Sequence, residues 1–261
     1  MASTYVYAED FGELQTEIKS IWDTNSNLDL VDIELIDDKW TAVFEDNLRS
    51  SLYTSNSDFE LFQEQIIEQW DRGYEIVDIE YVDDTWVGVF KESGRIIFSG
   101  SAYSFAEDLT GLKADIQEQW DQDYNLINVE YVNGNWISIY DNNFNRTGYS
   151  TSDSLLEFKA DVEEFNNGGF DLVGVEYAEG KFVGVFYEDD FNYTTYSVSS
   201  NTDEFLTKFE QHRSQGYDLI DFEQRDDNIL IGVYEHPNSD TSGLDELRSD
   251  FLDISFGLAV L

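Results

Sequence analysis

The sequence predicts an α+β repeat protein of five helix-plus-three-strand units, closed into a fivefold α/β propeller, or toroid. Three observations lead to this prediction. A phrase recurs at near-constant spacing, the periodicity within each copy changes from helical to extended, and the opening segment looks like the last strand of a unit. The predicted units span about residues 4–44, 45–90, 91–140, 141–187 and 188–236, and a tail follows at 237–261.

The recurring phrase is clearest in WDRGYEIVDIEYVDDTWVGVF (70–90) and WDQDYNLINVEYVNGNWISIY (120–140). Each copy has a glutamate in its middle and a bulky apolar residue about six positions later. The glutamates are Glu34, Glu80, Glu130, Glu176 and Glu223, and the apolar residues are Trp40, Trp86, Trp136, Phe182 and Ile229. Because the glutamates are 46, 50, 46 and 47 residues apart, the phrase marks one structural unit repeated five times.

An amphipathic helix is predicted ahead of each phrase. In the second unit Phe59, Phe62, Ile66 and Trp70 recur at spacings of three and four, which places them on one helical face. An Asp or Ser precedes each helix as a candidate N-cap, and Gly73 is suited to end this one in a left-handed conformation.

Two antiparallel strands are predicted within the phrase. EIVDIEYV (75–82) alternates apolar and acidic residues, as expected for a half-buried strand. A short acidic or glycine-containing turn follows, and Asn133-Gly134 is a typical two-residue hairpin turn. A third strand, such as RIIFSGSAY (95–103) or NYTTYSVS (192–199), leads into the next helix.

The two ends of the repeat region predict how the units close. The N-terminal TYVYAEDFGEL matches a third strand that enters a helix, whereas the fifth unit breaks off at Pro237 after two strands. We therefore expect the N-terminal strand to complete the last unit, which would leave no exposed sheet edge. An open arc with an ordinary N-terminal edge strand is the alternative.

Composition excludes several functions. The chain has 56 acidic and 14 basic residues, a formal net charge of −42, so it would repel nucleic acids and anionic membranes and attract cations or basic partners. It has no cysteine and only two histidines, His212 and His236, which argues against thiolate or histidine-centred chemistry. With 41% hydrophobic residues it can form a packed core, and no apolar run is long enough for membrane insertion.

The repeated glutamates are the candidate metal site. If the strands that carry Glu34, Glu80, Glu130, Glu176 and Glu223 surround the axis of a ring, their carboxylates approach one another and either retain protons or recruit a cation, for which calcium is the natural candidate. The alternative is a structural hydrogen bond repeated with the unit. Catalysis is disfavoured because equivalent copies supply identical carboxyls, whereas an acid and a base need different environments.

Three tryptophans are candidate ligand-binding residues. Trp40, Trp86 and Trp136 begin the second strand of their hairpins, next to acidic turns. Exposed indole rings beside Asp and Asn would suit a sugar, and packing in the core is the alternative.

The repeat resembles a known family. Trp70, Gly73-Tyr74, Ile79, Trp86 and Val89-Phe90 match the tandem module of uncharacterised function found C-terminal to plant casein-kinase-1-like kinases and in bacterial proteins, over about residues 4–235. The resemblance implies an accessory binding or scaffold role. The five-unit layout is also similar to the pentein propellers, but their catalytic members need a cysteine, which this chain lacks.

The tail is the only indication of localisation. NSDTSGLDELRSDFLDISFGLAVL (238–261) resembles the uncleaved C-terminal signal of type I-secreted bacterial proteins, and a helix docked on the ring is the alternative. The sequence begins without a recognisable signal peptide. The resemblance implies an extracellular protein, with a cytoplasmic one as the alternative.

The resulting functional hypothesis is a non-enzymatic binding or scaffold protein that presents an acidic surface to a cation, a glycan or a protein partner. Two alternatives stay open: a glycan-active hydrolase that uses Asp/Glu pairs, and a calcium-dependent, self-assembling extracellular or surface protein.

Overall fold

The computed structural model describes residues 4–37, 39–46, 50–92, 100–142, 146–188, 192–225 and 227–237. These residues form five units, each a strand, a helix and a β-hairpin. The helices are α1 (Phe11–Thr24), α2 (Phe59–Asp71), α3 (Leu109–Trp120), α4 (Leu155–Asn167) and α5 (Thr202–Ser214). The predicted tail, beyond Pro237, and the first half of the strand predicted at 95–103 lie outside the described residues.

The fifteen strands take three positions in the units. The strands before the helices are β1 (Thr4–Ala8), β4 (Ser51–Asn56), β7 (Ser101–Ala106), β10 (Thr147–Ser152) and β13 (Asn192–Ser199). The first hairpin strands, here called the inner strands, are β2 (Leu28–Ile36), β5 (Tyr74–Val82), β8 (Asn125–Val132), β11 (Asp171–Ala178) and β14 (Asp218–Gln224). The second hairpin strands are β3 (Lys39–Asp46), β6 (Thr85–Glu92), β9 (Asn135–Asp141), β12 (Lys181–Tyr187) and β15 (Leu230–Pro237).

Four of the five helices begin at a predicted Asp or Ser cap, α5 begins at Asn201, and α2 ends at the predicted glycine. A side chain before each one accepts a hydrogen bond from a backbone N–H of the first turn: Asp10, Asp58, Asp108, Ser154 and Asn201. Gly73 follows α2 with φ of 87° and donates to the Trp70 carbonyl at 2.9 Å. Phe62 and Ile66 are fully buried on the predicted apolar face of α2.

The prediction that the N-terminal strand completes the fifth unit is wrong. β1 pairs antiparallel with β3 of its own unit, from Thr4 opposite Phe44 to Ala8 opposite Trp40. The last unit has its own strand, β13, and every sheet has the second hairpin strand in the middle. The strand before each helix therefore belongs with the helix that follows it, because the helix returns the chain to the far side of the same sheet.

The hairpin turns confirm the predicted turn type, with one change of register. Asn133 and Gly134 both have positive φ, 52° and 77°, as a two-residue hairpin turn requires. In the fifth unit the turn is longer, and Leu230 pairs with Gln224. Leu230, fully buried, thus fills the position predicted for Ile229.

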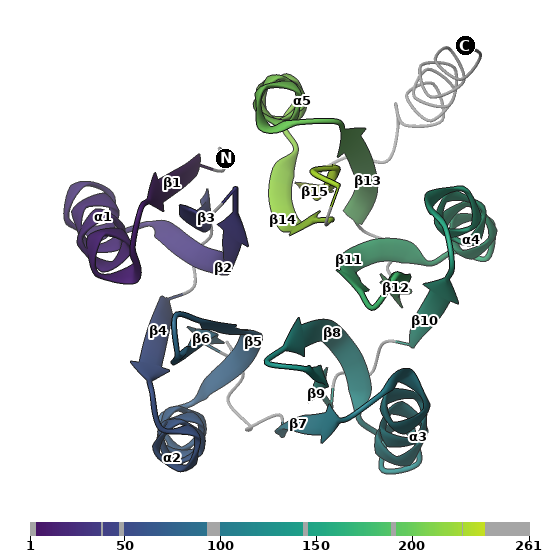
Figure 1. Ribbon diagram of the computed structural model, residues 1–261, viewed down its shortest axis with the longest axis horizontal. Coiled ribbons are helices and arrows are strands. Elements are labelled where there is room, and N and C mark those ends of the chain that lie inside the picture. The colour runs from purple at the N-terminus through teal and green to yellow at the C-terminus, as the bar shows by residue number, and fades with distance from the viewer. Residues whose placement is uncertain are drawn as a thin grey trace.

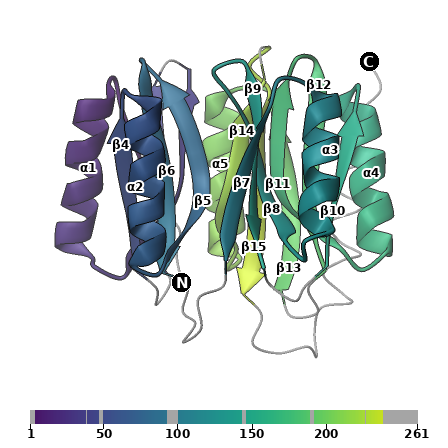
Figure 2. The same cartoon turned by 90° about the horizontal axis from the view of Figure 1, so that it is seen from below.

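The five units surround a common centre, with the inner strands facing it and the helices outermost (Figure 1). Helices and strands run side by side along the same direction (Figure 2). Among the described residues no sheet continues from one unit into the next, so side chains rather than strand pairing connect the units.

Each apolar core combines one unit with the second hairpin strand of the next. The first core, for example, joins Leu14 and Ile18 of α1 to Val87 and Val89 of β6. The same arrangement connects the fifth unit to the first, where Phe209 and Phe222 share a core with Val43. The backbone N–H of Asp37 also donates to Gln224 Oε1 at 2.8 Å across this contact.

Under each helix, a large residue is matched by a small one on the middle strand. Where the helix carries a phenylalanine the strand carries a glycine, as in Phe62/Gly88, Phe158/Gly184 and Phe205/Gly232. Where the helix carries a leucine the strand residue is larger, as in Leu14/Ala42 and Leu112/Ser138. A methyl group on Gly184 would lie 3.1 Å from the Phe158 ring and 3.0 Å from Phe186. The helix residue and the strand residue of each pair therefore have to fill one fixed volume together.

We expect Gly184→Ala to lower the free energy of unfolding by about 1–3 kcal/mol through overpacking, and Phe158→Leu to remove much of that cost in the double variant. Urea unfolding of the four proteins in the cycle measures the coupling. Phe158→Leu combined with Gly88→Ala, which contacts Phe62 instead, is the matched control and should be additive. Additive costs in the Gly184→Ala cycle as well would show that the two residues do not share one volume.

Candidate metal centre

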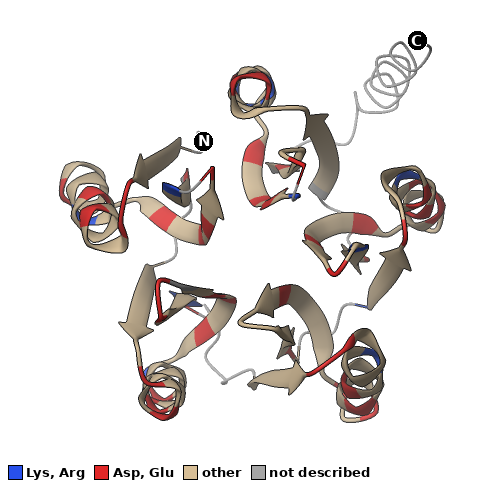
Figure 3. Cartoon of the chain, in the orientation of Figure 1, with Lys and Arg blue, Asp and Glu red and all other residues tan. Residues whose placement is uncertain are grey.

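The acids at the centre come from the inner strands. Their sequences are LDLVDIELI, YEIVDIEYV, NLINVEYV, DLVGVEYA and DLIDFEQ, with no lysine or arginine in any of them. In Figure 3 the inner strands carry acidic bands and no basic ones. The described inner strands therefore supply negative charge to the centre and no positive charge to neutralise it.

The aspartates of these strands connect neighbouring units. Each inner strand is the edge of its sheet, so one row of its backbone N–H groups lacks a strand partner. The Ile33 N–H donates to Asp78 Oδ2 of the next unit at 3.2 Å, and the Val175 N–H donates to Asp221 Oδ2 at 2.7 Å. Asp32 accepts in the same way from the Phe222 N–H of the fifth unit. A neighbour's carboxylate thus takes the place of a neighbouring strand.

The third and fourth units depart from this pattern, with Asn128 and Gly174 at the aspartate position. The Val129 N–H donates to Asn128 Oδ1 of its own unit at 2.8 Å. Asn128 Nδ2 donates to the Val77 carbonyl at 3.1 Å and to Glu130 Oε1 at 2.7 Å. Asparagine therefore both joins the second and third units and orients one of the central glutamates.

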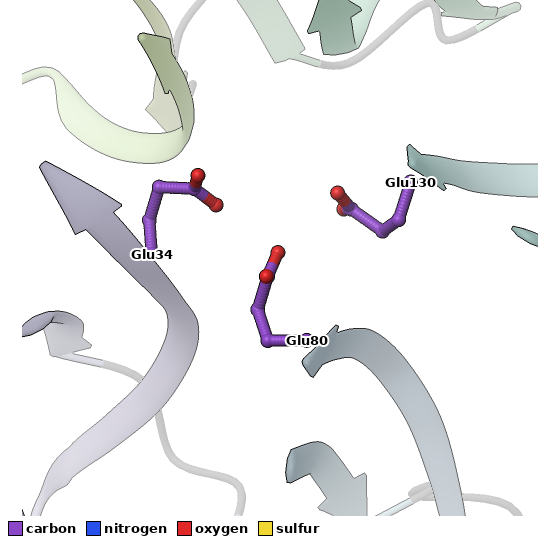
Figure 4. A group of neighbouring side chains, drawn as sticks. All are labelled: Glu34, Glu80 and Glu130. Atoms are coloured by element: carbon purple, nitrogen blue, oxygen red, sulfur yellow. The ribbon is translucent and has the colours of Figure 1, made fainter. Parts of the chain in front are cut away.

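Three of the five predicted glutamates meet directly (Figure 4). One carboxylate oxygen from each of Glu34, Glu80 and Glu130 lies within 4.8 Å of the others. Glu80 and Glu130 are buried, and Glu34 is partly exposed. Glu176 and Glu223 are buried in the same ring and lie within hydrogen-bonding reach of each other, but they are not part of this group.

Burial is the largest cause that raises the pKa of the central carboxyls, and repulsion from the other acids raises it further in all of them except Asp221. The pKa of Glu34 rises to about 8, and those of Asp78 and Asp221 to about 7, with burial as the largest cause in each. The same direction holds for Asp32, Glu80, Glu130, Glu176 and Glu223. Since eight carboxyls are crowded here, the centre is stable only if protons or cations compensate their charge.

The donor set fits a hard cation. Carboxylate and carbonyl oxygens are the ligands of calcium, and an ion about 2.4 Å from two oxygens permits them to be up to about 4.8 Å apart. Asp32 Oδ2 is buried, in a residue that is 6% exposed, and it accepts no hydrogen bond from the described residues. The charge of Glu34 acts on Asp32, so this unsatisfied oxygen belongs to the same electrostatic centre. Glu34, Glu80 and Glu130 are the residues that would hold the ion.

The candidate sugar-binding tryptophans are in the core. Trp40 and Trp136 are fully buried, and Trp86 is 7% exposed. The indole N–H of Trp40 donates to Asp83 Oδ2 at 3.4 Å, and that of Trp136 to Glu179 Oε2 at 3.3 Å, in each case a turn residue of the next unit. Because no ring face is open to a sugar, these residues are structural, as the alternative prediction had it.

Sequence reasoning identified the glutamates but assigned no role to the aspartate row. Asp32 and Asp78 are visible in the sequence two positions before the glutamates. What the sequence does not show is that the bulge before each aspartate turns its carboxylate to the neighbouring unit's backbone. The role of Asn128 is equally hidden in the sequence, where it looks like one more polar residue at the aspartate position.

Comparison with known proteins assigns neither family nor function. No protein-family model matches the chain, and no curated protein sequence matches it either. The resemblance to the kinase-associated module stays a prediction. None of the described helices combines the length and apolar character needed to cross a membrane.

The raised pKa values predict an unusual pH dependence for metal-free protein. A carboxyl whose pKa is raised in the folded state contributes stability that is fully present below about pH 4 and lost as the pH rises through its folded pKa. We therefore expect the free energy of unfolding in EDTA to fall between about pH 6.5 and 8. Burial lowers the pKa of His212 from 6.5 to about 4. This residue therefore lowers the free energy of unfolding only when the pH falls below that window.

Asp78→Asn tests the cause of this dependence, because it removes one titrating carboxyl and keeps its shape. Its unfolding free energy should exceed that of the native protein at pH 8 and depend less on pH. Asp71→Asn, an exposed residue of α2, is the matched control and should leave the slope unchanged. Chemical denaturation at several pH values measures both. A stability that rises with pH across this window would contradict the prediction.

Proposed function

We propose that the protein is a non-enzymatic binding or scaffold protein, a closed ring of five units whose centre binds a hard divalent cation, calcium by preference. One observation carries this proposal: the carboxylates of Glu34, Glu80 and Glu130 converge within 4.8 Å, on strands that contain no basic residue. Such a group repels itself unless it is protonated or holds a cation. A cation would then hold the first three units together.

Closure of the ring is supported by the contact between the fifth and first units. The Phe222 N–H donates to Asp32 across it, as the Ile33 N–H donates to Asp78 between the first and second units. The apolar core there is built in the same way as the others, with one unit's helix packed on the next unit's hairpin. A head-to-tail contact that recurs at the last step is the requirement for a closed ring.

A binding role is favoured over hydrolysis. An acid and base pair needs two carboxyls with pKa values displaced from each other. Here the eight central carboxyls all shift upward, Glu34 to about 8 and Asp78 and Asp221 to about 7 among them. A site of three or four carboxylates without a preformed loop suits the millimolar calcium of an extracellular setting. We therefore retain an extracellular location as part of the proposal.

Calcium should stabilise the protein and EDTA should reverse the effect. At a free concentration 100 times the dissociation constant, a ligand that binds only the folded state adds about 2.7 kcal/mol to the free energy of unfolding. The double variant Glu34→Gln/Glu80→Gln should lose this increment. Urea unfolding with and without calcium measures it.

The matched control is Glu60→Gln/Glu68→Gln, which removes the same charge from exposed positions of α2. It should keep the full calcium increment. If calcium leaves the native protein's unfolding free energy unchanged, or if the control loses the increment equally, central cation binding is excluded.

Hydrogen exchange tests ring closure in the native protein. In a closed ring the amides of β2 and β14 should be protected as strongly as those of β8, because every inner strand has a neighbour on both sides. Asp32→Ala should accelerate exchange at the Phe222 amide and leave the Val175 amide, which donates to Asp221, unchanged. Faster exchange throughout the first and fifth units of the native protein would indicate an open arc with frayed ends.

A further inference from the structure

The central acids are not distributed with fivefold symmetry. The aspartate position is acidic in the first, second and fifth units, as Asp32, Asp78 and Asp221, but holds Asn128 and Gly174 in the third and fourth. The two uncharged positions are consecutive. Negative charge is therefore concentrated on one side of the centre.

Asn128 also fixes one member of the glutamate group. Its Nδ2 lies 2.7 Å from Glu130 Oε1, and its Oδ1 is occupied by the Val129 N–H at 2.8 Å. With both ends of the amide bound, the side chain cannot flip without losing these contacts. Glu130 is thereby oriented before any ligand arrives, which lowers the cost of ordering it on binding.

One further acid adds an oxygen to the same group. Asp78 is 2% exposed and lies within hydrogen-bonding reach of Glu130, and its Oδ1 accepts no hydrogen bond from the described residues. Its charge acts on all three glutamates. An oxygen that no described group satisfies, next to three converging carboxylates, is the position where a positive ion gives the largest gain.

The remaining two glutamates lie outside the group of three. Glu176 and Glu223 are within hydrogen-bonding reach of each other, as Glu34 and Glu80 are, so the two sides differ in the number of oxygens that converge rather than in this contact. Gly174, next to them, contributes no carboxylate. This side of the centre therefore has fewer oxygens and less charge for a cation.

We propose that the ring holds one divalent cation, between its first three units, on Glu34, Glu80 and Glu130, with Asp78 adding charge beside them. This inference rests on the proposed function and adds that the ring holds a single ion and that Glu176 and Glu223 take no part in binding it. All donors are oxygens, and the chain has no cysteine, so the ion is a hard one such as calcium rather than zinc. Every unit has the glutamate, but only the group of Glu34, Glu80 and Glu130 binds the ion.

Isothermal titration calorimetry of metal-free protein with calcium chloride tests both the number of bound ions and their location. The native chain should bind one ion. Glu80→Gln and Glu130→Gln should weaken binding at least tenfold. Glu176→Gln and Glu223→Gln, the same change at the same position of other units, should alter it less than threefold. Circular dichroism spectra identical to the native one establish that each variant is folded.

The outcomes separate this inference from the proposed function. Binding of more than one ion, or equal weakening by all four variants, overturns the location between the first three units and leaves central cation binding intact. No binding by the native chain overturns both. Retention of full affinity in folded Glu80→Gln and Glu130→Gln, with one ion bound, places the ion elsewhere on the chain and also overturns the inference.

Discussion

The unpaired edge of each inner strand is the constraint on which the structure depends. A sheet of three strands has two edges, and the edge that faces the centre presents backbone N–H groups that water or another strand would normally satisfy. Here the neighbouring unit supplies a side-chain acceptor instead, as Asp78 does for Ile33 and Asp221 does for Val175. The contact is directional, from one unit to the next. Five sheets can therefore associate around a centre without forming one continuous sheet.

The same solution creates the electrostatic problem at the centre. An aspartate aimed at a neighbour's backbone brings its charge inward, and the glutamate two residues later on the same strand follows it. Hydrogen bonds from Ile33 and Val175 favour the ionised aspartates and lower their pKa, but burial outweighs them, and the pKa of Asp78 and Asp221 still rises to about 7. The interactions that join the units thus bury negative charge that protons or cations have to compensate.

Much of this arrangement follows from sequence alone, and the rest depends on contacts between units. The helical faces, the hairpin turns and the inward glutamates are local, because spacing and turn chemistry specify them within one copy. The assignment of the N-terminal strand failed because a strand between two units reads equally well as the end of one or the start of the next; only the pairing of Thr4 with Phe44 decides it. The convergence of Glu34, Glu80 and Glu130 is equally invisible in sequence, where five equivalent glutamates look alike.

The departure from symmetry at the third and fourth units is one coupled change rather than two. With glycine at position 174, the fourth unit offers no acceptor to the Val129 N–H, and Asn128 of the third unit accepts that hydrogen bond itself. An aspartate at 128 could do the same, but only an amide can also donate to the Val77 carbonyl and to Glu130. The pair therefore removes two charges and adds a donor without leaving a backbone group unsatisfied. It converts a centre of five equivalent positions into one with a distinct acidic side, and a single ion requires such a difference to occupy one position.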